Sequence, residues 1–311
     1  MSNSPLSRPG SSGRTGDKVF STVTLAAGCL ILAVLFSVAI FLLVQALPAF
    51  YADPDEVTGG EGFWAYIWPI VVGTVMAAAI ALIIATPIAM GVALFISHYA
   101  PRKLAQGLGY IIDLLAAIPS VIYGVWGIAF LANELQPIYE WLAQNAGWIP
   151  IFAGPASATG KTMLTAGIVL AVMILPIITA ISREIFLQTP KLHEEAALAL
   201  GATRWEMIRM TVIPFGRPGV ISAVMLALGR ALGETMAVAL VLSTGPLLAS
   251  LIQSGNSTIA AEIALNFPEA YGLRLSELIA AGFVLFVITL AVNMLARWVI
   301  SRHKEFSGAN A

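Results

Sequence analysis

The sequence predicts an all-α, polytopic membrane protein with six transmembrane helices. Hydrophobic residues make up 59% of the chain and charged residues only 11%, about half the charged fraction of an ordinary soluble domain. Six separate apolar segments are long enough to cross a bilayer, which takes about 20 residues in a helix. Basic residues gather in alternate connections between these segments, as they do in membrane proteins. A surface of this composition would be solvated by lipid and not by water.

The first apolar segment covers residues 19–52 and follows a polar tail. Residues 1–18 are rich in Ser, Gly and Pro. This composition has little to bury, so we expect a disordered cytoplasmic tail there. The apolar segment is far longer than the core of a cleavable signal peptide, which has about 7–15 residues. It is therefore expected to remain as a membrane helix.

Five further segments are long and apolar enough to be membrane helices. Prolines inside them, such as Pro87, Pro119 and Pro176, predict kinks at which neighbouring helices satisfy the freed carbonyl groups. Asp113 is the only charged residue of the third segment, and no role is assigned to it. In order after the first, the expected spans are 63–97, 104–132, 162–182, 218–242 and 278–296.

The charges of the connections predict the orientation of the chain. Basic residues precede the first span, lie between the second and third and between the fourth and fifth, and follow the sixth. The other connections contain only Lys161 and Arg274 as basic residues. By the positive-inside rule, both termini are cytoplasmic. We therefore expect a six-helix membrane domain over residues 19–303 and a second cytoplasmic tail over residues 304–311.

Charge and composition exclude several other functions. The formal net charge is −1, so the chain lacks the basic surface that binding to nucleic acid requires. Cys29 is the single cysteine, which excludes an internal disulfide. His98, His193 and His303 are far apart in the sequence, so we expect no metal ion or other cofactor. No pair of nucleophile and base indicates an enzyme.

Residues 154–162, GPASATGKT, nearly spell a nucleotide-binding P-loop. That motif has four residues between its two glycines, whereas this segment has five. The segment also precedes a membrane helix on the predicted external side, away from cytoplasmic ATP. If ATP drives this protein, the hydrolysis must take place on another chain.

The cytoplasmic connection at residues 190–214 is predicted to fold into two short helices. Residues 193–200 are strong helix formers, and Gly201 suits a helix stop because glycine tolerates positive φ. Thr203, with Glu206 three residues later, is the pattern of a capping box. On composition alone, an ordinary solvated hairpin is the favoured interpretation of this segment.

The same connection resembles the EAA loop of ABC importer permeases. The motif covers residues 195–214, with Thr211 and Ile213 departing from the usual Ile and Leu at its trailing end. In that family the loop forms the coupling helix, which docks in a groove of the ATP-hydrolysing subunit. The resemblance implies that four residues couple this chain to an ATPase: Glu195, Ala196, Ala197 and Gly201.

The fifth span contains a charged pair, Arg230 and Glu234. An arginine inside a membrane costs about 2.5–3.5 kcal/mol on insertion scales. The two residues are four apart, hence on one face of a continuous helix and able to pair. Gly229 and Gly233 form a small-xxx-small patch that permits close helix packing. The pair either neutralises itself within the bundle or offers Arg230 to a passing oxyanion, which a guanidinium suits.

Three segments resemble phosphate-importer permeases. They are GRALGETMAV at 229–238, IPSVIYGVWG at 118–127 and ILPIITAISREI at 174–185. The resemblance covers about residues 18–303 and is strongest to the PstC type, although sulfate and molybdate permeases carry a similar RALGE core. It implies that Arg230 and Glu234 take part in translocation.

The resemblance further implies a type I ABC importer permease of the bacterial inner membrane. Such a chain forms half of a phosphate pathway and has no ATPase site of its own. The partners implied are a homologous PstA-type permease, a dimer of PstB-type ATP-binding subunits and an extracytoplasmic PstS-type phosphate-binding protein. Alternatives are import of another tetrahedral oxyanion, sulfate or molybdate, and an ion-coupled secondary transporter.

Overall fold

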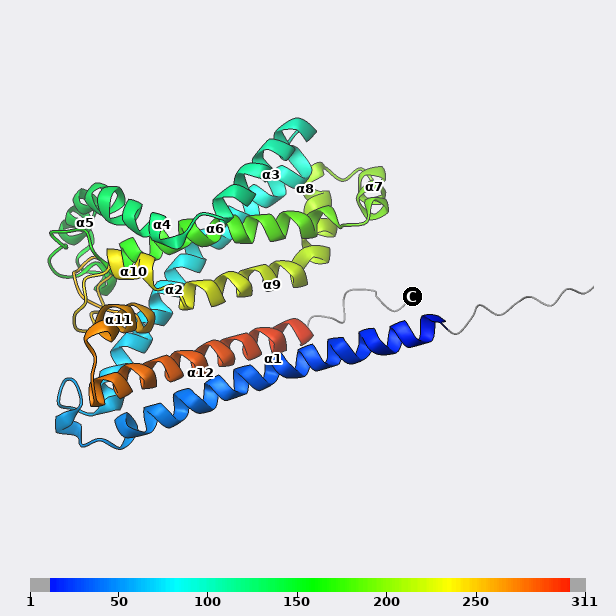
Figure 1. The fold of residues 1–311 in the computed structure, drawn as a ribbon. Helices are drawn as coiled ribbons and strands as arrows, with labels where there is room; N and C mark the ends of the chain where they lie inside the picture. The colour runs from blue at the N-terminus through cyan, green and yellow to red at the C-terminus, as the bar shows by residue number, and fades with distance from the viewer. Residues whose placement is uncertain (1–11, 303–311) are drawn as a thin grey trace, which may run out of the picture.

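A computed structural model describes residues 12–302, and these residues are mostly helical without any strand (Figure 1). Residues 1–11 and 303–311 of the expected tails lie outside this range. The α-helices are α1 (Ser12–Tyr51), α2 (Phe63–Leu94), α3 (Arg102–Ala116), α4 (Ser120–Trp126), α5 (Ala132–Ala146), α6 (Met163–Leu187), α7 (Lys191–Ala199), α8 (Arg204–Met207), α9 (Ile213–Leu232), α10 (Met236–Val241), α11 (Ile259–Asn266) and α12 (Leu273–Arg302).

The described residues contain five helical runs long and apolar enough to cross a membrane. A sixth crossing is a bent pair, in which Arg102–Ala116 and Ser120–Ala146 meet at 90°. The predicted all-α membrane fold is confirmed, with six spans when the bent pair counts as one. Below, the two ends of the bundle are called cytoplasmic and external, as the basic residues predict.

The third span is broken, although one helix was expected over residues 104–132. α3 ends at Ala116, and α4 begins at Ser120. Pro119 explains the break, because proline has no N–H to donate and disfavours the helical conformation of the preceding residue. The hydroxyl group of Tyr123 donates a hydrogen bond of 2.8 Å to the carbonyl group of Leu115. A carbonyl that the break leaves without a helical partner is thereby satisfied.

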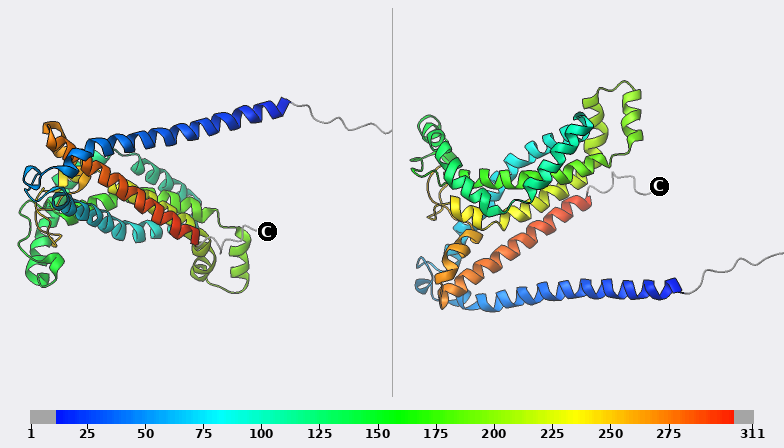
Figure 2. Two further views of the ribbon diagram at one scale, coloured as in Figure 1. Left: turned by 90° about the horizontal axis from the view of Figure 1, so that it is seen from below. Right: turned by 45° about the horizontal axis from the view of Figure 1, so that its top comes forward.

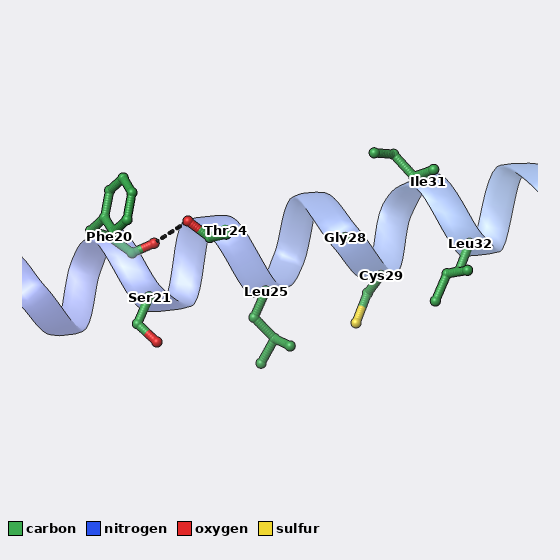
Figure 3. Close-up of a pocket in the computed structure, with 8 residues that line it drawn as sticks. All are labelled: Phe20, Ser21, Thr24, Leu25, Gly28, Cys29, Ile31 and Leu32. Carbon is green, nitrogen blue, oxygen red and sulfur yellow. Dashed lines mark hydrogen bonds between the residues drawn. The ribbon is translucent and has the colours of Figure 1, made fainter. Parts of the chain in front are cut away.

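The first span begins earlier than expected, at Ser12, so residues 12–18 are helical and not part of a tail. Extending an existing helix by a few residues is cheap, because the cost of nucleation is already met. α1 packs along α12, and its N-terminal end projects beyond the other helices (Figures 1 and 2). A recess on the N-terminal half of this helix is lined by residues of α1 alone, including Cys29 (Figure 3). It is part of a lipid-compatible surface.

The core of the bundle is built on α6, which packs against α2, α9 and α3. α2 meets α6 with a row of buried alanines spaced four residues apart, so the row lies on one helix face. Small side chains let two membrane helices approach closely. The row consists of Ala77, Ala81, Ala85, Ala89 and Ala93.

At the external end, the segment before α11 is seated on α2. Thr74 accepts a hydrogen bond of 2.9 Å from the backbone N–H of Ile259. The neighbouring Gly73 has no room for a side chain, because a Cβ there would overlap the carbonyl oxygen of Ser257. These contacts fix the start of α11 to α2.

Arg274 of α12 joins several elements at the same end. Its guanidinium donates to Glu277 at 2.8 Å, to Glu262 of α11 at 2.9 Å and to Thr58 at 3.0 Å. It also lies over the ring of Tyr66 in α2, 5.1 Å from the centroid. The connection between α1 and α2, together with α2, α11 and α12, is therefore held by one polar network.

Candidate translocation site and coupling hairpin

The charged residues of the fifth span lie on either side of a break. α9 ends just before Gly233, and α10 begins at Met236. The expectation of one helix over 218–242, with Arg230 and Glu234 paired on one face, is therefore wrong. Glycine is the weakest helix former after proline, which favours termination at this position.

Glu234 caps α10 instead of pairing with Arg230. The residue is only 9% exposed, and its Oε1 accepts a hydrogen bond of 3.2 Å from the backbone N–H of Ala237. The first turn of a helix has N–H groups without helical partners, which a side-chain oxygen can satisfy. The carboxylate of Glu234 is thus engaged at the helix start.

Arg230 is exposed in the last turn of α9. Among residues 12–302, no carboxylate lies within ion-pairing distance of its guanidinium. The guanidinium does interact electrostatically with the hydroxyl group of Tyr123 in α4. A planar group with five donors and no acceptor suits a ligand that offers several oxygens. The site therefore presents a cation that the described chain leaves without a counterion.

Two glycines bring the segment 118–127 against the broken fifth span. A Cβ at Gly124 would lie 2.8 Å from the Cα of Ala237, and one at Gly127 would lie 2.6 Å from Cγ2 of Val169. Neither position has room for a side chain, so α4 packs directly on α10 and α6. Two motifs that are far apart in the sequence are thus in direct contact.

The cytoplasmic connection contains the predicted first helix and turn, but its second helix is not a separate short one. α8 continues through the π-helical turn Ile208–Val212 into α9 as one run, Arg204–Leu232, so Pro214 does not end it. We call α7, α8 and the residues between them the coupling hairpin (residues 191–207). Gly201 ends α7 with a φ of +86°. Thr203 and Glu206 form the expected capping box, in which Glu206 Oε2 accepts from the Thr203 N–H at 2.8 Å and the Glu206 N–H donates to Thr203 Oγ1 at 3.3 Å.

The residues of the EAA motif divide between two faces of the hairpin. Glu195 and Ala196 are exposed, whereas Ala197 is buried. Ala197 packs in a cluster that joins the hairpin to the bundle and includes Ala93 and Ile208. Ala197 therefore attaches α7 to the bundle, whereas Glu195 and Ala196 lie on its solvent-exposed side.

An open groove of about 630 Å³ lies on the hairpin. Large apolar side chains on and around it are exposed to solvent, with Leu200 88% and Leu192 79% exposed. Exposed apolar surface beside a charged membrane boundary is typical of a protein interface. The lining residues are His193, Ala196, Ala197, Leu200, Gly201, Ala202, Glu206, Met210 and Thr211.

A family model matches residues 85–305, a range that includes both the coupling hairpin and the broken fifth span. The family is described as the inner membrane component of binding-protein-dependent transport systems. The chain belongs to this family. The resemblance drawn from its motifs is confirmed.

Relatives of this permease cover almost its whole length. PstC 2 of Mycobacterium tuberculosis (strain ATCC 25618 / H37Rv), a phosphate transport system permease protein, is 44% identical over 316 residues, which cover 96% of this chain and 97% of that protein. PstC of Mesorhizobium japonicum, a protein of the same description, is 40% identical over 308 residues, with coverage of 94% and 92%.

Solved structures share the fold of this permease. One is a bacterial ABC transporter involved in the import of alginate, with a TM-score of 0.56, 19% identity and coverage of 93% of this chain and 96% of that chain. Another is the MetNI methionine ABC transporter in an inward-facing conformation, with a TM-score of 0.54, 17% identity and coverage of 77% and 98%. These similarities confirm the type I ABC importer permease fold.

The permease is therefore a multi-pass protein of the inner membrane and one part of a larger transport system. It works with an ATPase and a binding protein, and its relatives are permease subunits and not enzymes. The sequence analysis gave no individual role to Tyr123 or Gly124. The sequence carried little signal for them, because Gly124 and Gly127 are three residues apart and do not form the small-xxx-small spacing of close helix packing.

The close contact at Gly124 makes a testable prediction about this permease. We expect Gly124→Val to reduce transport about tenfold or more, because overpacking would push α4 away from α10. Gly107→Val in α3 is the control, since no atom lies within 4 Å of a Cβ built there. Transport by both variants is measured in proteoliposomes that contain the whole complex. Equal transport by the two variants would contradict the packing argument.

Proposed function

We propose that this permease forms half of the translocation pathway of an ATP-driven importer of inorganic phosphate. The observation that carries the proposal is the exposed guanidinium of Arg230, which has no counterion among the described residues. Phosphate offers several oxygens to the fixed donors of a guanidinium. The names of the relatives, which are phosphate transport system permeases, support the same substrate.

The proposed mechanism is alternating access. Closure of the ATPase dimer moves the coupling hairpin, and the bundle then changes the side from which Arg230 is reached, from the external to the cytoplasmic side. Arg230 offers positive potential to the anion while it is away from water. Glu234 stabilises the break between α9 and α10 beside Arg230. Its negative charge also limits how tightly an anion is bound. Rapid transport needs such moderate binding, because a strongly bound anion would not leave.

The proposed partners follow the same scheme. A homologous PstA-type permease supplies the other half of the pathway, and a PstS-type binding protein delivers phosphate at the external end. A dimer of PstB-type subunits hydrolyses ATP and docks on the hairpin, where Glu195 and Ala196 are exposed and Gly201 sets the turn. The groove with its exposed Leu200 suits a largely apolar contact.

Competition experiments test the substrate. The purified complex is placed in proteoliposomes with ATP inside, and uptake of labelled phosphate is measured with a large excess of sulfate or molybdate. We expect neither anion to reduce phosphate uptake appreciably. Strong competition by sulfate or molybdate would instead favour a permease for that oxyanion. Uptake that continues without ATP would favour an ion-coupled transporter, which membership of a binding-protein-dependent family argues against.

The turn of the coupling hairpin makes a second prediction. We expect Gly201→Val to reduce phosphate uptake about tenfold, because a β-branched residue is strained at a φ of +86° and the hairpin would change shape. Gly60→Val places the same strain, at a φ of +72°, in the external connection between α1 and α2. This control should keep near-normal uptake. If both variants lose uptake equally, the effect is a general loss of folding and not of coupling.

A further inference from the structure

The last turn of α2 changes from α-helical to π-helical at Phe95–Tyr99. The backbone N–H of Ala100 donates to the carbonyl group of Phe95 at 2.8 Å, which closes the wider turn. Single π-helical turns are rare and are found frequently at functional sites. This turn, here called the α2 π-turn, places two successive side chains, His98 and Tyr99, beside the coupling hairpin.

His98 contacts the first helix of the hairpin. Its side chain is 7% exposed, and its Nε2 lies 3.5 Å from Oε1 of Glu194 in α7. Its Nδ1 lies 2.7 Å from the hydroxyl group of Ser97. The one hydroxyl proton of Ser97 can go either to the carbonyl oxygen of Leu94, 3.3 Å away, or to Nδ1 of His98; donation to Nδ1 leaves the proton of the neutral ring on Nε2, facing Glu194. Ser97 thus orients the imidazole toward α7.

Tyr99 contacts the second helix of the hairpin. The guanidinium of Arg204, the first residue of α8, lies 5.6 Å from the centroid of the Tyr99 ring. This distance is within the range of a cation–π interaction. The two contacts lie on opposite sides of Gly201, so the α2 π-turn holds both arms of the hairpin.

No other hydrogen bond, ion pair or cation–π contact among residues 16–297 joins the hairpin to an element distant in the sequence. The apolar cluster around Ala197 supports the same attachment, since Ala93 of α2 belongs to it. α2 and the π-turn form one continuous helical run of 37 residues, Phe63–Tyr99. At its external end this run carries Thr74 and Tyr66, which contact α11 and the Arg274 network.

We propose that His98 and Tyr99 are positioning residues that transmit movement of the coupling hairpin to α2. The hairpin and the π-turn move together, and α2 carries that movement to the external end. The proposal rests on the proposed coupling to an ATPase and goes beyond it, because it assigns the receiving element within this chain. Removal of the contacts should therefore uncouple ATP hydrolysis from transport and not simply lower both.

The first experiment uses the reconstituted complex in proteoliposomes, with phosphate uptake and ATP hydrolysis measured on the same sample. We expect His98→Ala and Glu194→Ala each to lower phosphate uptake per ATP about threefold to tenfold, which lies inside the range of effects of mutations within coupling networks. The double variant should have the same phosphate uptake per ATP as the more impaired of the two single variants, because each substitution removes the same contact. His98→Gln, which keeps a donor, should restore part of the ratio.

Matched variants separate this effect from a general loss of structure. Tyr99→Phe keeps the aromatic ring below Arg204 and should therefore keep normal phosphate uptake per ATP. Tyr99→Leu removes the ring and should lower phosphate uptake per ATP. Gln106→Ala, an exposed position of α3, should have no effect. An unchanged ratio in His98→Ala and Glu194→Ala, or losses that multiply in the double variant, would overturn the proposal.

Cross-linking keeps the proposal testable if an alanine variant does not assemble. His98→Cys and Glu194→Cys are combined in a Cys29→Ser background, which removes the single native cysteine. With its two thiols free, the double-cysteine variant should have a low phosphate uptake per ATP. A short thiol-reactive cross-linker between the two cysteines should restore this uptake per ATP, because the two residues move together. A cross-link that stops ATP-driven transport would mean that this contact must open during the cycle, which overturns the proposal.

Failure of the proposed substrate gives a different result. If the wild-type complex hydrolyses ATP in response to its binding protein but moves no phosphate, the substrate is wrong. The proposal about the α2 π-turn is then judged by the stimulation of ATP hydrolysis by the binding protein, which needs no knowledge of the substrate. His98→Ala and Glu194→Ala should reduce that stimulation by the same factor, and normal stimulation would overturn the proposal.

Discussion

Replacing Arg230 with glutamine should reduce phosphate uptake about 100-fold or more, while the transport complex still assembles. A hydrogen bond to a charged group contributes about 1.5–3 kcal/mol, and the variant loses both the charge and the paired donors. The described chain gives Arg230 no carboxylate partner, so its loss strands no opposite charge inside the bundle. Uptake of labelled phosphate and recovery of the purified complex measure the two effects separately.

Two further variants sharpen this test. Arg230→Lys keeps the positive charge without the planar donor fork, and should therefore have uptake between that of wild type and Arg230→Gln. Arg102→Gln makes the same chemical change at the exposed start of α3 and should leave uptake unchanged. Wild-type uptake by Arg230→Gln would remove Arg230 from the pathway and with it the main support for the proposed site.

Replacing Gly73 with alanine should have the largest effect on folding. The added methyl group would overlap the carbonyl oxygen of Ser257, which is a backbone atom and has no alternative rotamer. Relief of the overlap requires the segment before α11 to leave its seat, and the hydrogen bond between Thr74 and Ile259 would be lost. Overpacking of this kind costs about 1–3 kcal/mol, occasionally more. Thermal unfolding in detergent should therefore begin at a clearly lower temperature.

Gly91 provides a control on the same helix. No atom lies within 4 Å of a Cβ built at Gly91, and alanine is a better helix former than glycine by about 1 kcal/mol. Gly91→Ala should therefore unfold at the same or a slightly higher temperature than wild type. If Gly73→Ala is as stable as Gly91→Ala, then the segment before α11 is not fixed to α2 as described.

Much of the fold was predictable because membrane helices have strong local signals. Apolar length found the membrane segments, although the fifth run covers residues 204–232 and not 218–242, and the third is a bent pair. The pattern of Thr203 and Glu206 predicted the capping box that the structure contains. Gly201 was correctly expected to end a helix with positive φ. Each of these features depends on residues close together in the sequence, so no knowledge of tertiary contacts was required.

The breaks in the third and fifth spans were not predictable in the same way. Pro87 and Pro176 lie inside continuous helices, whereas Pro119 ends one. At Pro119 the carbonyl group of Leu115 accepts from the Ile118 N–H and from the Tyr123 hydroxyl group. At Gly233 the break depends on the capping of α10 by Glu234. Hydropathy and residue spacing do not show which side chains form hydrogen bonds with backbone groups at a helix break.

The site was predicted only in part for the same reason. Spacing placed Arg230 and Glu234 on one helical face, which assumed a continuous helix that the structure does not have. The contact between α4 and α10 at Gly124 joins segments far apart in the sequence, and sequence motifs alone could not show that they meet. His98 appeared only as an isolated histidine, because its partner Glu194 lies in another helix.

The polar network at the external end has a consequence for how a substrate enters. Two carboxylates, those of Glu262 and Glu277, share a single guanidinium, so the network carries one negative charge in excess. An anion that arrives there by free diffusion is repelled, and the repulsion is strongest at low ionic strength. The excess charge of Glu262 and Glu277 therefore gives the external end of this chain a local field that disfavours a free anion beside them.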